Sequence, residues 1–152
     1  MKALYHYTSE RQHLPVILAS GELRGRADMA GARPLIWFSA HPFWEPTATK
    51  PRWMGGLLVP QTFEEYYDVF GCVRFALPTC DGRLMDWRRA CKFAGIPKRD
   101  RWALESVGAK EGGHPRHWFA LAGPVPLAEL RAEQLVGSQW QSLRVEEGAS
   151  HV

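Results

Sequence analysis

Two neighbouring stretches decide how this chain begins to fold: "LYHYTSERQHLPVILASGELRG" (residues 4–25) and "PLIWFSAHPFWEPTATK" (residues 34–50). The first predicts a short strand over 3–9, because apolar and polar residues alternate there. A helix follows and ends at Gly21. Its one-sided apolar stripe is Leu14, Ile17 and Leu18. The second stretch predicts a buried strand that ends in a polar residue, followed by a loop rich in proline. Two polar strand ends so close in sequence predict the walls of one pocket.

The rest of the chain alternates short strands with a few helices. "GCVRFALP" (71–78) predicts a strand, and "RLMDWRRACKFAG" (83–95) predicts a helix. The segment 97–116 predicts mostly loop, whereas 117–121 and 139–145 predict strands. We therefore expect an α+β fold with two or three helices, in a single domain over 1–152 whose tail frays from about residue 146.

Composition narrows the function classes. Of the 152 residues, 45% are hydrophobic and 23% are charged, which is typical of a globular domain. The net charge of +3 is too small to predict binding to nucleic acid. Three cysteines without CxxC spacing favour a reducing compartment, so we expect a cytoplasmic protein. No apolar stretch approaches membrane-spanning length, and membranes are not expected as partners. We expect no metal, because His114 and His117 lack further ligands nearby in sequence.

The first candidate site is the end of the first strand. His6 and Thr8 lie two residues apart and therefore on one face of that strand. An imidazole there could bind a ligand hydroxyl, act as acid or base, or lie satisfied in the core. Thr8 or Ser9 can cap the following helix, whose N-terminus favours anions such as phosphate.

The second candidate site follows the buried strand. Ser39 ends that strand, and is either a pocket residue or a turn residue before Pro42. Glu45 stands between an aromatic residue and a proline, where a fixed carboxylate can orient a hydroxyl or stabilise a developing cation. The alternative for Glu45 is a salt bridge to Arg33 or Lys50.

Arg74 and the tryptophans also leave two interpretations open. Arg74 is a lone arginine inside an apolar strand, where it could bind phosphate bidentately or extend from an edge strand to solvent. The seven tryptophans suit either a core with polar edges or the walls of a ligand site.

These residues resemble those of a known family. "LYHYTSERQHLPVILASGEL" (4–23), "WFS" (37–39) and "HWFALAGPVPLAEL" (117–130) are similar to the ADP-ribosyltransferase superfamily, in the branch of the DNA-modifying toxins and the RNA 2′-phosphotransferases. The resemblance implies split mixed β-sheets, NAD as a substrate and a protein or nucleic acid as acceptor. It makes His6 a ligand of the NAD ribose. The other residues it would bring to NAD are Tyr7, Thr8, Ser9, Trp37, Phe38, Trp44, Arg74 and His117.

The resemblance fails at one important position. The transferases carry a catalytic glutamate on the late strand, where this chain has His117 and Trp118. Three alternatives follow: Glu45 takes over that role, the chemistry is of the glutamate-free type, or the pocket binds without turnover. In the enzyme interpretation Glu45 stabilises the oxocarbenium ion that forms when nicotinamide leaves, and His6 and Ser39 hold the ribose. Trp37 or Trp44 then forms the wall, and Arg74 binds the pyrophosphate.

Three hypotheses follow from the sequence. The first is an NAD-using transferase with His6, Ser39 and Glu45 as catalytic residues. The second is a non-catalytic module of the same fold that binds a nucleotide or a partner. The third is a small interaction protein whose tryptophans all belong to the core.

Overall fold

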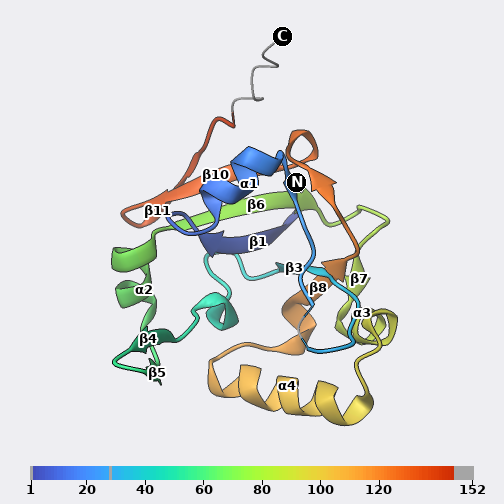
Figure 1. Cartoon of the computed structure of the whole chain (residues 1–152). Coiled ribbons are helices and arrows are strands. Elements are labelled where there is room, and N and C mark those ends of the chain that lie inside the picture. Colours follow the sequence, from blue (N-terminus) through green and yellow to red (C-terminus); the bar gives the residue numbers. More distant parts are fainter. Residues whose placement is uncertain (1, 28, 146–152) are drawn as a thin grey trace.

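The computed structural model of the chain describes residues 2–27 and 29–145. Its main sheet has seven strands in the order β11-β10-β6-β1-β3-β8-β7 (Figure 1), and each neighbouring pair is antiparallel. These strands are β1 (Ala3–Ser9), β3 (Ile36–Ser39), β6 (Cys72–Pro78), β7 (Met85–Asp86), β8 (Trp118–Leu121), β10 (Arg131–Val136) and β11 (Gln139–Ser142). Two smaller sheets pair β2 (Glu22–Leu23) with β9 (Val125–Pro126) and β4 (Arg52–Met54) with β5 (Leu57–Val59). The predicted α+β class is confirmed.

The two strands predicted from the clearest patterns form the centre of the sheet. β1 pairs along its whole length with β6, from Ala3 opposite Pro78 to Ser9 opposite Cys72. On its other side β1 meets β3, with Tyr5 opposite Ser39. Every residue of β6 from Cys72 to Leu77 is buried, because helices and loops cover both faces of the sheet there. The segments 4–25 and 34–50 are thus brought together by direct strand pairing.

Four α-helices lie within the described residues, one more than the upper end of our expectation. They are α1 (Leu14–Ser20), α2 (Phe63–Phe70), α3 (Trp87–Ala94) and α4 (Lys98–Lys110). α3 lies where the sequence predicts a helix: the Asp86 side chain accepts from the Arg89 amide, and Gly95 ends the helix at φ 79°. The prediction of a loop over 97–116 was wrong for most of that segment, which forms α4. Only Gly108 of α4 is buried, so no apolar stripe signals this helix in the sequence.

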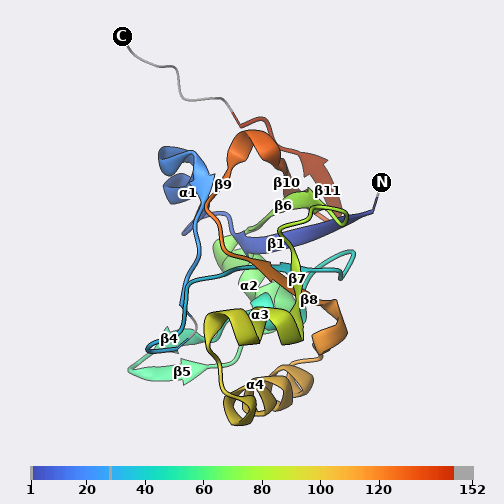
Figure 2. The same cartoon turned by 90° about the vertical axis from the view of Figure 1, so that its right-hand side faces the viewer.

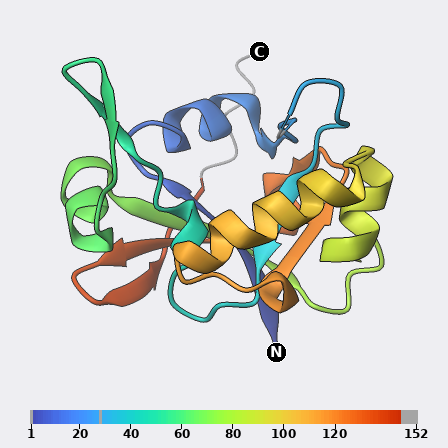
Figure 3. The ribbon, with the colours of Figure 1, turned by 90° about the horizontal axis from the view of Figure 1, so that it is seen from below.

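The helices lie around the sheet in distinct places. Leu14 and Ile17 of α1 pack against the largest apolar cluster, which contains Leu4, Phe38 and Phe75. Figure 2 shows α1 at the top beside β9, and α3 and α4 at the bottom. Seen from below, α4 crosses in front of β3 and β8 (Figure 3). Three short 3-10 helices, η1 (Pro46–Ala48), η2 (Pro115–His117) and η3 (Leu127–Glu129), complete the connections.

Three expectations from the sequence concern the chain as a whole. The frayed tail from about residue 146 lies outside the described residues. A single domain over 1–152 stays a prediction, although β1 and β11 belong to the same sheet. None of the helices in the described part of the chain is long and apolar enough to cross a membrane.

Candidate functional site

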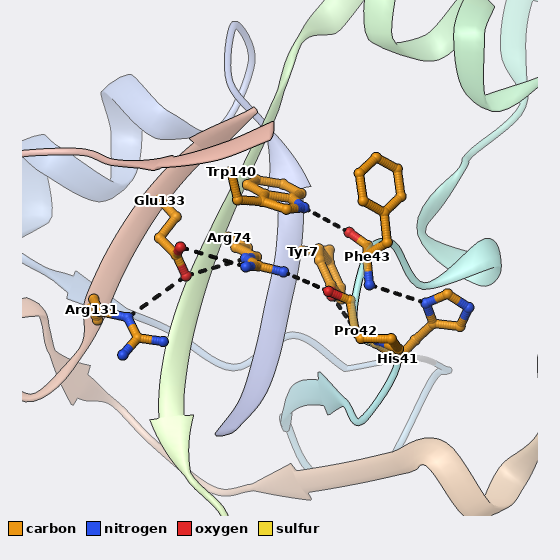
Figure 4. A network of polar contacts seen from close by, with 8 residues as sticks. All are labelled: Tyr7, His41, Pro42, Phe43, Arg74, Arg131, Glu133 and Trp140. Atoms are coloured by element: carbon orange, nitrogen blue, oxygen red, sulfur yellow. Dashed lines mark hydrogen bonds and ion pairs between the residues drawn. The ribbon is translucent and has the colours of Figure 1, made fainter. Parts of the chain in front are cut away.

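The segment that follows β3 is held by side chains from three different strands. We call residues 40–49 the anchored loop. Three successive carbonyls in it accept hydrogen bonds, those of His41, Pro42 and Phe43 (Figure 4). Their donors are the Tyr7 hydroxyl of β1, Arg74 of β6 at 2.9 Å and the Trp140 indole of β11 at 3.0 Å. Burial raises the pKa of the Tyr7 hydroxyl, so that it remains a donor. A loop without strands is therefore fixed from strands 32 to 97 residues away in sequence.

Arg74 is the centre of this network. Its guanidinium lies 3.9 Å from the ring centroid of Tyr5 and 4.4 Å from that of Trp140, between the two rings. Its Nε lies 3.2 Å from the Glu133 carboxylate, and the two side chains are 8% and 13% exposed. Figure 4 shows Arg131 approaching the same carboxylate. The donors of Arg74 are therefore directed to Glu133 and to the loop, and the predicted pyrophosphate contact would have to compete with them.

Glu45 is the buried carboxylate of the site, and only 6% of the residue is exposed. One oxygen accepts the Ser39 hydroxyl at 2.6 Å. The other accepts the Trp118 indole at 3.0 Å and the Thr47 hydroxyl at 2.9 Å. A buried charge needs such partners, and here all of them are neutral donors.

The predicted alternative for Glu45, an ion pair, is absent from the described residues. Neither Arg33 nor Lys50 lies within ion-pair distance of its carboxylate there; Lys50 instead donates to the Thr47 carbonyl at 3.2 Å. Ser39 also accepts the His41 amide at 3.0 Å, and so ties the end of β3 to the anchored loop. The structure thus brings Ser39 and Glu45 together, as the sequence predicted.

Two half-exposed histidines flank this carboxylate. The rings of His41 and His117 are 6.3 Å apart, edge to face. Burial, followed by the charge of Arg116, lowers the pKa of His117. The Nδ1 atom of His41 is 3.3 Å from the amides of both Phe43 and Trp44 and accepts from them, which leaves Nε2 as the protonated atom of the neutral ring. The negative charge of Glu45 opposes the lowering of the His117 pKa, so this ring lies within reach of the carboxylate's field.

His6 lies on the other side of the sheet. Because Tyr5 is directly opposite Ser39, these two share a face, and His6 points to the opposite one. There its Nδ1 donates to the Trp37 carbonyl at 2.7 Å, and its ring meets the edge of Phe38 at 6.0 Å. Burial lowers the pKa of His6. The structure therefore does not bring His6 into contact with Ser39 and Glu45.

Thr8 and Ser9 do not cap α1. The helix begins at Leu14 with His13 at its N-cap, and no side chain caps it. Ser9, fully buried, accepts the Gln12 amide at 3.1 Å within the preceding turn, while Thr8 contacts the His13 ring at 2.7 Å. The cap on which the expected anion site depended is therefore not formed. The Ser9 hydroxyl instead accepts the nearby Gln12 amide and closes the turn that precedes α1.

The predicted aromatic walls belong mainly to the interior. Trp37 packs on Trp87 at 5.4 Å, and Trp87 packs on Trp118 at 5.0 Å, so that a row of three indoles ends at Glu45. Trp44 is 5% exposed and packs on Tyr7, and Phe38 is 2% exposed. The remaining tryptophans are not all core residues. Trp53 and Trp102 are 69% and 55% exposed.

Two clefts lie elsewhere on the molecule. One, of about 550 Å³, is lined by Arg24, Arg33 and Phe93 among others, and the Arg33 guanidinium lies 5.2 Å from the Phe93 ring. The other, of about 520 Å³, lies between α1 and η3 and is lined by Leu18, Leu127 and Arg131 among others. Neither is lined by a predicted site residue. For the first cleft the sequence offered only a compositional signal, the three arginines of the glycine-containing segment 24–33.

Within residues 2–27 and 29–145, no group of three or more His, Cys, Asp or Glu side chains could hold a metal ion. No protein-family model, curated protein or solved structure matches the chain. The resemblance to ADP-ribosyltransferases therefore depends on the three sequence segments 4–23, 37–39 and 117–130.

Proposed function

We propose that this chain is an NAD-binding ADP-ribosyltransferase-like enzyme in which Glu45 replaces the missing late-strand glutamate. One observation carries the proposal: the indole of Trp118, at the start of β8, donates to Glu45 at 3.0 Å. Trp118 occupies the region where the resemblance places the catalytic carboxylate. A loop carboxylate thus lies beside the strand that lacks its own.

The proposed chemistry follows from charge. The bond between C1′ of the ribose and the nicotinamide nitrogen breaks, and its electron pair neutralises the pyridinium ring. The ribose becomes an oxocarbenium ion, which a nearby carboxylate stabilises. A nucleophile of a macromolecular acceptor, protein or nucleic acid, then attacks C1′ and loses its proton to water. The Ser39 hydroxyl donates to Glu45 at 2.6 Å, and the half-exposed His117 is near enough for the charge of Glu45 to act on its pKa.

A second candidate is a non-catalytic module of the same fold that binds a nucleotide or a partner. It is favoured by the full engagement of Glu45, whose two oxygens accept bonds from Ser39, Thr47 and Trp118 while only 6% of the residue is exposed. In this form the carboxylate fixes the anchored loop and touches no substrate.

A reducing, cytoplasmic setting is part of the proposal. No disulfide joins the three cysteines, all of which lie in the described part of the chain; Cys72 and Cys91 are buried and Cys80 is exposed. Burial raises the pKa of the Cys72 thiol to about 12, which makes it unreactive. An oxidising compartment would expose Cys80 to pairing between molecules.

The test combines thermal unfolding with a direct assay for nicotinamide. NAD that binds the native state raises the unfolding midpoint. We expect NAD to raise it for the wild type and for Glu45→Gln, which keeps an acceptor for Trp118. Nicotinamide release should fall about 100-fold in Glu45→Gln, the usual size of a lost electrostatic contribution. The exposed Glu64→Gln on α2 is the matched control and should release nicotinamide normally.

The outcomes separate the candidates. A midpoint shift without nicotinamide release from the wild type would favour the binding module. Equal release by wild type and Glu45→Gln would remove Glu45 from the mechanism. If millimolar NAD neither shifts the midpoint nor is cleaved, both NAD hypotheses are wrong.

A further inference from the structure

The most exposed apolar element of the molecule is the hairpin that follows the anchored loop. We call residues 52–59, which form β4, a turn and β5, the apolar hairpin. All eight of its residues are exposed. Its large apolar side chains are Trp53 (69% exposed), Met54 (53%), Leu57 (70%), Leu58 (53%) and Val59 (37%). Contiguous apolar surface of this kind marks an interaction site in a folded protein.

Both faces of the apolar hairpin are apolar. Trp53 pairs with Leu58 across the two strands, and Met54 pairs with Leu57. Neighbouring residues of a strand point to opposite faces, so these two pairs cover opposite sides. A partner surface that covers one side would leave the other in water. Complete burial needs surroundings that enclose the hairpin.

The length of the hairpin is fixed by its sequence. Pro51 and Pro60 stand at matching positions outside the strands, where they cannot donate to further pairing. The turn is Gly55–Gly56, with φ angles of 57° and 81°, values that suit a tight two-residue turn. Three residues per strand reach roughly 10 Å, at about 3.3 Å per residue. That reach equals the depth, about 5–10 Å, to which apolar groups enter the boundary between headgroups and acyl chains of a bilayer.

The charges within residues 46–63 have one sign, although Glu111 of the neighbouring segment lies near Lys50. Between Glu45 and Glu64 the chain has no acidic residue. Lys50 and Arg52 stand at the base of the hairpin, and both are exposed. Basic side chains beside an inserted apolar element favour anionic lipid headgroups. Gln61 donates to the Lys50 carbonyl at 2.9 Å, and so closes the base.

We propose that the apolar hairpin inserts into the interface of an anionic lipid bilayer and anchors the protein there without spanning the membrane. A second copy of the chain is the weaker occupant, because the five apolar side chains expose on the order of 500 Å² against the ~800 Å² per partner of a standard interface. The proposal departs from our expectation of no membrane partner, which considered only the length of apolar stretches. It is independent of the chemistry at Glu45.

Co-sedimentation with vesicles tests the proposal. We expect the full chain to bind vesicles of phosphatidylserine and phosphatidylcholine in equal amounts, and pure phosphatidylcholine vesicles more weakly. The double variant Trp53→Ser/Leu58→Ser should bind at least about tenfold more weakly, because binding follows the apolar area that enters the interface. Lys50→Gln and Arg52→Gln should each weaken binding to the anionic vesicles about fivefold, and added salt should do the same.

Trp102→Ser supplies the matched control, since Trp102 is 55% exposed on α4 but lies outside the hairpin. It should bind vesicles as the wild type does. Equal losses in Trp102→Ser and the double variant, or no vesicle binding by the wild type, would overturn the proposal. Sedimentation velocity without lipid adds a second check. A dimer that disappears in the double variant would assign the hairpin to a second copy instead.

Discussion

The anchored loop (40–49) and the apolar hairpin (52–59) follow one another in sequence and differ in almost every structural respect. The loop has no strand, yet its carbonyls are bound by Tyr7, Arg74 and Trp140. The hairpin has regular strands and a tight turn, yet all its residues are exposed. Regular secondary structure is therefore no measure of rigidity here. Partners distant in sequence fix the loop, whereas an isolated two-stranded hairpin is only marginally stable in water.

The largest expected difference is between two tryptophans of these regions. Trp44 is 5% exposed and packs on Tyr7 and Tyr66 at 5.2 and 5.6 Å. Trp44→Ala should lower the free energy of unfolding by about 4 kcal/mol, since it leaves a large cavity. Trp53→Ala should change it by less than about 0.5 kcal/mol. Urea unfolding of both variants measures this, and similar losses would show that the hairpin packs on the body in solution.

The next expected effect concerns the centre of the network. Arg74→Met should lower the free energy of unfolding by about 3 kcal/mol, because the Pro42 carbonyl loses its donor and the Glu133 carboxylate keeps only Arg131, 3.7 Å away. Arg74→Lys keeps the charge but loses the planar contacts with Tyr5 and Trp140, and should recover only part of this loss.

Hydrogen exchange of the anchored loop gives a second readout for Arg74. In Arg74→Met, amides of the loop should exchange faster, while those of the apolar hairpin should remain unchanged. Unchanged exchange in the loop would mean that Tyr7 and Trp140 hold it without Arg74.

The smallest expected effect is a dependence of the free energy of unfolding on pH. It should come from residues outside the apolar hairpin, since Arg52 is the only ionisable side chain of the hairpin. Burial holds the pKa of His6 below 6.5 in the folded state. Between that lowered pKa and about pH 6.5 the unfolded chain binds the proton more readily, so the free energy of unfolding should fall as the pH falls. The slope from one such group is at most about 1.4 kcal/mol per pH unit.

The variant His6→Gln tests this dependence. Glutamine can still donate to the Trp37 carbonyl but does not titrate, so the slope of stability against pH should decrease. At pH 8 His6 is neutral in both the folded and the unfolded state. There the two proteins should differ in stability only through the replacement of the histidine donor to the Trp37 carbonyl by a glutamine donor. An unchanged slope would assign the acid sensitivity to His13 or His117, whose pKa values are also lowered.

Local sequence patterns determined much of the fold. Alternation predicted β1 and β6, and the glycines after α1 and α3 end those helices with φ angles of 73° and 79°. Ser39 and Glu45 could be expected to meet because six residues of chain, with a proline bend, return the carboxylate to the end of its own strand. Each of these features depends on neighbours within a few residues.

The tertiary structure alone decided the rest. The amphipathic signal of α4 is absent because only Gly108 of that helix is buried. The partners of Arg74 come from β1, β10, β11 and the anchored loop, and no local pattern specifies them. His6 and Ser39 were expected in one pocket because two polar strand ends lie close together in sequence, but the register of Tyr5 opposite Ser39 places them on opposite faces of the sheet. Register depends on pairing between distant segments, which the order of residues along one segment does not contain.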